Sequence, residues 1–171
     1  MLLARTLYDP FEADIDALRR GRYGVIETRG GRLWAIHVRR WPKFVSVIET
    51  DWLTRRDHEA KPGDRCLLYY DQPRRFPNFL AVKFAISQRD CTLATICTSL
   101  AVLDEVARVK RSDALLCDVW NLRISERMLA RWGWEPHKPQ RWHRNYIKRF
   151  YGEYPQSTAL STCETVGVTT C

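Results

Sequence analysis

The junction at Gln88–Thr95 is the stretch whose residues are best placed for chemistry. It joins a run rich in Phe, Val and Ile to a pattern typical of a long helix. The first turn of a helix leaves backbone N–H groups without partners and carries a partial positive charge, so an anion could bind there. The junction holds no glycine, and Asp90 would repel an anion, so its side chains limit how closely a phosphate could approach.

A second set of candidate residues is basic and lies near the C-terminal end. Arg123, Arg127 and Arg131 are spaced four residues apart, which places them on one face of a predicted helix. The stretch Arg141–Arg149 then alternates cations with aromatic rings, a pattern that can stack on single-stranded nucleic acid and neutralise it. The alternatives are a solvated face for the helix, and an edge strand whose charges discourage aggregation for the alternating stretch.

Residues that could act as nucleophiles, acids, bases or metal ligands show no catalytic motif. The four histidines have no spacing such as HExxH, and the six cysteines form no CxxC pair. Reduced thiols are the simplest interpretation of the cysteines, because cytosolic disulfides are rare. Glu49 and Asp51, near the end of a predicted strand, are candidates for a general base.

Apolar periodicity and turn signals predict the elements that must position these residues. Helices are expected at Phe11–Arg20, Thr92–Arg111 and Leu122–Trp132, with a short one at Asp51–Glu59. Strands are expected at Tyr23–Glu27, Leu33–Val38, Phe44–Ile48, Cys66–Tyr70, Asn78–Ser87, Ala114–Val119 and Arg141–Phe150. The paired glycines in Arg29–Arg32 predict a hairpin turn between the first two strands. Asp90 or Thr92 can cap the long helix.

Length and composition limit the classes of protein. A chain of 171 residues is long enough for one domain, which we place at 1–154, followed by a Ser/Thr-rich tail at 155–171. No apolar run is long enough to span a bilayer, and Asp9 follows the N-terminus too early for a secretory signal, so a cytoplasmic location is expected. The formal net charge of +8 is densest in residues 122–151 and favours an anionic partner: a nucleotide cofactor, nucleic acid or an acidic surface.

Residues Asn78–Phe150 run strand, helix, strand, helix, strand. With Asn121, Ser125 and the Gly133-Trp134 pair, this half of the chain resembles the C-terminal half of the GNAT superfamily of N-acetyltransferases. In that family a central strand feeds a diphosphate-binding loop and a long helix, and a later helix has an Asn-rich start and a Gly-aromatic end. The chain departs from the family in three places. One is that Asn121 lies one residue further from Gly133 than the usual spacing. The loop of this chain has no glycine, and Leu129 stands where the family often has a Tyr that acts as general acid.

The resemblance implies a fold, a cofactor and a set of site residues. The implied fold is α/β in an α+β layout: a single domain with a mixed, mostly antiparallel central sheet flanked by helices. The implied cofactor is acetyl-CoA, with its diphosphate at Ser87–Thr95 and its thioester near Asn121 and Ser125. A central-strand N–H around Phe84–Ile86 would stabilise the oxyanion. The cofactor-binding residues carried over are Ala85, Ile86, Ser87, Arg89, Thr92, Leu93, Thr95, Asn121 and Ser125.

The leading prediction is therefore an acyl-CoA-dependent N-acyltransferase-like protein. It would transfer an acetyl group directly to the amine of a small molecule or peptide. Fold does not imply function, so an inactive domain with the same sheet is the nearest alternative. The second class is a non-enzymatic basic module for nucleic acid, whose affinity would fall with salt. The third is an interaction protein that docks a partner on an exposed Trp-rich surface. The nucleic-acid class would rest on Arg123, Arg127, Arg131 and Arg144, and the interaction class on Trp120, Trp132 and Trp134.

Overall fold

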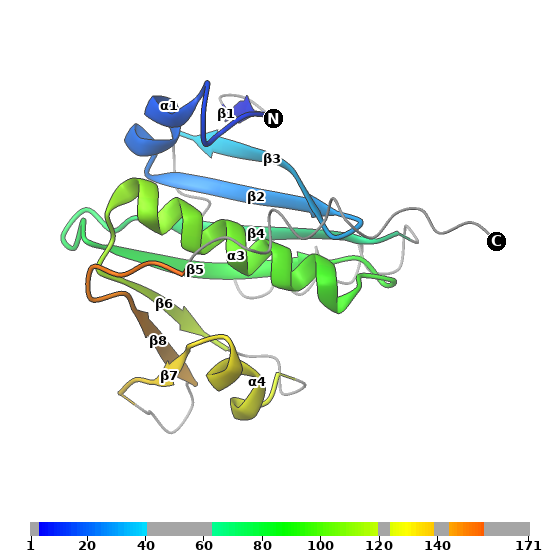
Figure 1. Ribbon diagram of the computed structural model, residues 1–171, viewed down its shortest axis with the longest axis vertical. Helices are drawn as coiled ribbons and strands as arrows, with labels where there is room; N and C mark the ends of the chain where they lie inside the picture. The colour runs from blue at the N-terminus through cyan, green and yellow to red at the C-terminus, as the bar shows by residue number, and fades with distance from the viewer. Residues whose placement is uncertain (1–3, 41–62, 120–123, 139–143, 156–171) are drawn as a thin grey trace.

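The structure is a computed structural model that describes residues 4–40, 63–119, 124–138 and 144–155. Within these ranges eight strands form one open, mixed sheet in the order β1-β3-β2-β4-β5-β6-β8-β7 (Figure 1). The strands are β1 (Ala4–Leu7), β2 (Tyr23–Arg29), β3 (Arg32–Arg39), β4 (Arg65–Asp71), β5 (Phe79–Ser87), β6 (Ala114–Asp118), β7 (Glu135–Pro136) and β8 (Asn145–Arg149). The helices are α1 (Ile15–Arg20), α3 (Leu93–Lys110) and α4 (Glu126–Arg131). The predicted α/β class, with a mixed and mostly antiparallel sheet, is confirmed.

The N-terminal part of the sheet is a hairpin with an added edge strand. Gly30 and Gly31 make the predicted turn between β2 and β3, with φ of +54° and +72°, which glycine adopts at little cost. Strand β1 pairs antiparallel with the outer side of β3 and was not predicted from the sequence. Helix α1 begins at Ile15 rather than at Phe11, because residues 11–14 form turns.

Helix α3 covers one face of the sheet and forms the core with it (Figure 1). Thr92 caps its start by accepting a hydrogen bond from the Thr95 N–H, as predicted. Its buried side chains pack against apolar residues that β2, β3 and β4 turn toward the helix. The core includes Ile26, Ile36, Leu68, Leu80, Val102, Leu103 and Val106. Because side chains alternate along a strand, the intervening residues lie on the opposite side of the sheet, which we call the far face.

The centre of the sheet contains its only parallel pair within the described residues. Strand β5 pairs antiparallel with β4 and parallel with β6. The β5–β6 ladder runs from Phe79–Ala114 to Val82–Cys117 and ends there. A β-bulge lies at the same point, because Tyr69 faces Phe84 while Tyr70 faces Val82, which leaves Lys83 without an opposite residue. Figure 1 shows β6 and β8 turning away from the far end of β5.

The last strand lies inside the sheet, so the prediction of an edge strand is wrong for its described part, Asn145–Arg149. Strand β8 pairs with β6 on one side and with the two-residue β7 on the other. Arg144, Tyr146 and Lys148 are spaced two residues apart, so their side chains lie on one side of the strand. The Arg144 guanidinium donates to the Ile124 carbonyl and the Tyr146 hydroxyl, and the Lys148 ammonium pairs with Asp104 at 2.6 Å.

Several predictions fall outside the described residues. They concern the strand Phe44–Ile48, the helix Asp51–Glu59, the candidate bases Glu49 and Asp51, and the tail at 155–171 apart from Pro155. In the part of the chain that is described, no helix combines the length and the apolar character needed to cross a bilayer.

Candidate functional site

The second half of β5 presents a backbone edge that the sheet does not use. The Gln88 N–H donates to the Arg65 carbonyl at 3.0 Å, so Gln88 and Arg65 form a hydrogen-bonded pair across β4 and β5. In an antiparallel pair, every second residue points its N–H and C=O groups toward the partner strand. Counting back from Gln88, Ile86 points these groups toward β4, whereas Ala85 and Ser87 point theirs away from it. On that side the ladder with β6 has already ended at Val82. We call this stretch, Lys83–Ser87, the open edge, because it has no strand partner beyond β4 in the described residues.

The open edge contains three of the residues carried over from the GNAT resemblance. Ala85 and Ser87 turn their backbone groups toward the gap between β5 and β6, where an extended ligand with amide groups could pair with them. Ile86 differs from both, because its backbone groups face β4 and its side chain is buried. Its role in binding therefore stays a prediction, whereas Ala85 and Ser87 have the geometry that such a role needs.

The start of α3 is closed by a carboxylate of the protein itself. Asp64 accepts a hydrogen bond from the Thr92 N–H and another from the Thr92 hydroxyl, both at 2.9 Å. Burial raises the pKa of Asp64, but hydrogen bonds from Thr95 and Thr92 outweigh it and hold the pKa below its usual value. Asp64 is therefore ionised at neutral pH and occupies the place where a helix start would hold an anion. A diphosphate at this point would have to displace it.

The turn that carries Asp64 packs closely on the junction after β5. A Cβ atom on Gly63 would lie 2.5 Å from the Oε1 atom of Gln88, so the turn and the end of the Gln88 side chain are in close contact. Nothing in the sequence indicated that Asp64 would reach the start of a helix 28 residues further on.

The other carried-over residues are divided between exposed and structural positions. Arg89 and Leu93 are exposed at the start of α3. Thr95 is fully buried, and its hydroxyl accepts a hydrogen bond from the Gly31 N–H at 2.7 Å. Ser125 caps α4 by accepting from the Met128 N–H at 3.3 Å. Asn121 lies outside the described residues. Thr92 and Thr95 therefore already have hydrogen-bond partners within the protein, and the diphosphate-binding role of the junction stays a prediction.

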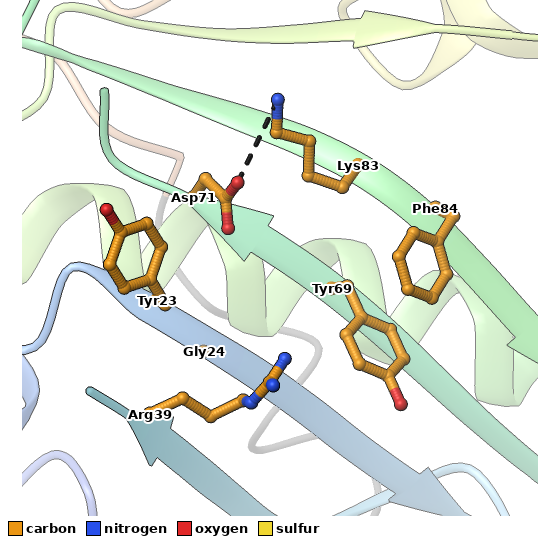
Figure 2. A pocket seen from close by; sticks show the side chains of 7 residues that line it. All are labelled: Tyr23, Gly24, Arg39, Tyr69, Asp71, Lys83 and Phe84. Carbon is orange, nitrogen blue, oxygen red and sulfur yellow. Dashed lines mark ion pairs between the residues drawn. The ribbon is translucent and has the colours of Figure 1, made fainter. Parts of the chain in front are cut away.

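A shallow hollow with an internal volume of about 10 Å³, room for about one water molecule, lies on the far face next to the bulge (Figure 2). Strands β2, β3, β4 and β5 each contribute to its wall, and Figure 2 shows α3 behind the sheet, on the other side. The lining residues are Tyr23, Gly24, Arg39, Tyr69, Asp71, Lys83 and Phe84. Lys83 and Phe84 belong to both the hollow and the first part of the open edge. The hollow therefore reaches β5 at the start of the open edge.

Asp71 is the acidic group of this hollow, and its surroundings make it a candidate base. Burial raises the pKa of Asp71, and the charges of Lys83 and Arg39 offset only part of that effect. The Lys83 ammonium lies 3.8 Å from the Asp71 carboxylate, a distance that is too long for a hydrogen bond. A carboxyl group in a hollow, with a raised pKa, suits proton transfer. The sequence did not point to Asp71, because the other lining residues come from distant strands.

The far face carries a second carboxylate, Glu27, whose side chain is only 4% exposed. It accepts hydrogen bonds from Arg29 at 2.7 Å, from Arg65 at 2.8 Å and from His37 at 2.9 Å. Burial would raise its pKa, but the hydrogen bonds from His37, Arg65 and Arg29 lower the pKa from 4.5 to about 2. Glu27 therefore stays ionised and joins β2, β3 and β4.

The residues proposed for the competing functions are partly used inside the fold. Arg144 is bonded to Ile124 and Tyr146, while Arg127 and Arg131 are exposed on α4. Trp134 is buried and Trp132 is half-buried; Trp120 and Arg123 lie outside the described residues. No group of three or more His, Cys, Asp or Glu residues in the described ranges could hold a metal ion.

Comparison with known proteins adds no relative to these observations. A scan against protein-family models, a search of curated proteins and a search of solved structures each found no match.

Proposed function

We propose that the chain is an acyl-CoA-dependent N-acyltransferase-like protein that transfers an acetyl group directly to an amine. The observation that carries the proposal is the open edge of β5, beside a parallel β5–β6 pair whose ladder stops at Val82 and Cys117. The amide groups of a pantetheine arm could pair with the backbone of Ala85 and Ser87 there. The order β5, α3, β6, α4, β7, β8 also agrees with the family that the sequence resembles.

In this proposal the hollow on the far face receives the amine. Asp71 takes the proton that the amine loses when it attacks the acyl carbonyl, and the sulfur departs as the C–S bond breaks. The bulge brings the start of the open edge, Lys83 and Phe84, to the wall of the hollow, so in this proposal the amine and the acyl group would have to meet over β5 on the far face. A cytoplasmic site of action belongs to the same proposal.

The nucleotide end of the donor does not fit the start of α3 as the family pattern would have it. Asp64 holds the Thr92 N–H and hydroxyl, and its negative charge would repel a diphosphate. The proposal therefore assigns donor binding to the open edge, and it gives the nucleotide only a small share of the affinity.

Calorimetric titration with acetyl-CoA and with S-acetylpantetheine, which lacks the nucleotide, tests this assignment. The two ligands should bind the native protein with affinities within about threefold of each other, since repulsion by Asp64 cancels most of the gain from the phosphates. Asp64→Asn should strengthen acetyl-CoA binding by roughly tenfold, the effect of one moderate charge interaction, and leave S-acetylpantetheine unchanged.

Asp90→Asn is the matched control. Asp90 is exposed in the same junction, and the substitution removes one negative charge, as Asp64→Asn does. It should change the affinity for acetyl-CoA much less than Asp64→Asn does. If neither ligand binds at millimolar concentration, the proposed function is wrong. If acetyl-CoA binds far more tightly than S-acetylpantetheine, the open edge is not the main binding surface.

Fewer arginine side chains are exposed for binding nucleic acid than the sequence predicted. Arg144 donates to the Ile124 carbonyl, which leaves Arg127 and Arg131 as the exposed members of the set within the described residues. A mobility-shift assay with single-stranded and duplex oligonucleotides at two salt concentrations separates the two classes. Binding that falls steeply with salt and is lost in Arg127→Gln/Arg131→Gln would favour the alternative.

A further inference from the structure

A hydroxyl, an imidazole and a carboxylate form a hydrogen-bonded chain on the far face, near the β1 edge of the sheet. The Oγ1 atom of Thr6 lies 3.0 Å from Nδ1 of His37, and Nε2 of His37 lies 2.9 Å from Oε2 of Glu27. We infer that Thr6 is a modification site, whose hydroxyl takes the acyl group of a reactive ester with His37 as the base. This site is separate from the proposed acyl transfer at the open edge, because strands β3, β2 and β4 lie between β1 and β5.

The register of the sheet brings the three side chains together. Thr6 on β1 lies directly opposite His37 on β3. Glu27 on β2 lies opposite Ala35, which is two residues before His37 on the same strand. His37 and Glu27 are therefore diagonal neighbours on one face, a separation that long side chains can bridge.

Glu27 decides which ring nitrogen of His37 carries the proton. Its Oε1 atom accepts from Arg29 at 2.7 Å and from Arg65 at 2.8 Å, which leaves Oε2 to His37. Burial would raise the pKa of Glu27, but the bonds from His37, Arg65 and Arg29 lower it to about 2. An ionised carboxylate can only accept, so Nε2 is the donor, and the other nitrogen of a neutral imidazole must then accept. Nδ1 therefore accepts from the Thr6 hydroxyl.

This arrangement is the one in which an alcohol becomes a nucleophile. The hydroxyl donates to an imidazole that can take its proton, and a third group holds the imidazole in the right tautomer. Exposure follows the same order, because Thr6 is half-buried, the His37 side chain is 25% exposed and the Glu27 side chain is 4% exposed. A small reagent can reach the hydroxyl while the carboxylate stays out of solvent. Glu27 is a positioning residue, since it acts only through His37.

The step forms one bond and breaks one. Oγ1 of Thr6 bonds to the acyl carbonyl carbon while its proton passes to Nδ1 of His37. The C–O bond to the leaving group of the ester breaks, and the departing oxygen takes the proton from the imidazole. The products are an O-acylthreonine and an alcohol, and no oxidant, reductant or metal enters the balance.

Reaction with p-nitrophenyl acetate, followed by peptide mass mapping, tests the inference without coenzyme A. Acetylation should appear at Thr6, and hydroxylamine should remove it, because hydroxylamine cleaves esters and leaves the amides of acetylated lysines. Ser125, whose exposed hydroxyl caps α4, is the internal comparison. It should react roughly 10²-fold more slowly, the lower end of what a general base contributes. Equal rates at Thr6 and Ser125 would overturn the inference.

Substitutions separate the hydroxyl from its base. Thr6→Val should abolish acetylation at position 6, and Thr6→Ser should retain it. His37→Gln should slow acetylation of Thr6 by roughly 10²-fold. His137→Gln, at another half-buried histidine, should leave the rate unchanged. A rate in His37→Gln equal to that of the native protein would contradict the role of the imidazole.

Nitrogen NMR of the native protein keeps the test open if His37→Gln fails to fold. The ring shifts of His37 at about pH 8 should show a proton on Nε2 and none on Nδ1. Glu27→Gln should weaken this preference and slow acetylation in the folded fraction, because an amide can donate as well as accept. A proton on Nδ1 in the native protein would mean that Thr6 accepts rather than donates, and the inference would fail. If Thr6 is acetylated as expected but acetyl-CoA does not bind, the modification site stands and the proposed function falls.

Discussion

Glu27 and Asp71 are two carboxylates on the same face of the same sheet, and their environments differ sharply. Glu27 lies in the middle of β2 and faces Leu67, whereas Asp71 lies at the end of β4 and faces Tyr23, four residues away in the same register. The pKa of Glu27 is lowered to about 2, and the pKa of Asp71 is raised. Both carboxyl groups are partly removed from solvent, so burial alone does not explain why one pKa is lowered and the other is raised.

Hydrogen bonds explain it. Three donors from three strands reach Glu27 at 2.9 Å or less, and together they stabilise its charged form more than burial destabilises it. Asp71 has Lys83 at 3.8 Å, close enough for attraction but too far for a hydrogen bond. A carboxylate that is fully paired holds a fold together. One that is partly desolvated and loosely paired remains free to exchange protons with a ligand.

The largest effect expected from this difference is on catalysis. Asp71→Asn should lower kcat/KM for acetyl transfer by roughly 10²–10⁴-fold, the usual contribution of a general base. Glu27→Gln, normalised to the folded fraction, should lower it much less, because Glu27 lies outside the hollow. Steady-state kinetics with acetyl-CoA and an amine measures both. A rate within tenfold of the native value in Asp71→Asn would remove Asp71 from the role of base.

The next largest effect concerns stability. Glu27→Gln should lower the free energy of unfolding by about 3 kcal/mol, because it leaves Arg29, Arg65 and His37 without their shared carboxylate. The midpoint of urea unfolding at pH 7 measures the loss. Glu12→Gln, at an exposed position on the same chain, should change the free energy of unfolding by less than about 0.5 kcal/mol. A loss no greater than that of Glu12→Gln would show that the cluster is not a stabilising unit.

The pH dependence of stability should show the same contrast. The folded-state pKa of Glu27 is about 2 and its ordinary pKa is 4.5, so its contribution is complete above pH 4.5 and disappears as pH falls toward 2. Unfolding midpoints from pH 2 to pH 6 should therefore rise steeply for the native protein and less steeply for Glu27→Gln. Parallel curves for the two proteins would contradict the pairing.

Periodicity and turn chemistry were enough to predict most of the fold, since they depend on neighbouring residues. The Gly30-Gly31 turn, the strands β4 and β5 and the capped helix α3 are all visible as local patterns. Strand β1 was missed because four residues with mixed polarity carry no period, and only pairing with β3 makes them a strand. The place of β8 inside the sheet was missed because its outer neighbour, β7, is two residues long.

The candidate site was harder to predict, because its important contacts join distant segments. The sequence located the junction after β5, and the GNAT resemblance named Ala85 and Ser87, whose role stays a prediction. It could not show that Asp64 would cap α3, since that contact spans 28 residues. Nor could it assemble the hollow, whose lining residues run from Tyr23 to Phe84 and meet only when β2, β3, β4 and β5 pair.

The smallest predicted effect tests the contrast between Asp71 and Glu27 most directly. Asp71→Asn should stabilise the folded protein at pH 7, whereas Glu27→Gln should destabilise it. The folded-state pKa of Asp71 is raised, so the ionised carboxylate costs stability once pH exceeds its ordinary pKa of 3.8. Asp71→Asn removes that cost and should raise the free energy of unfolding at pH 7 by roughly 0.5 kcal/mol, within the range of surface substitutions. The gain should vanish near pH 3, where the native carboxyl is protonated. Urea unfolding at the two pH values measures it. A loss at pH 7 comparable with that of Glu27→Gln would mean that Asp71 is a structural ion-pair partner like Glu27, and it would remove the physical basis for treating it as a base.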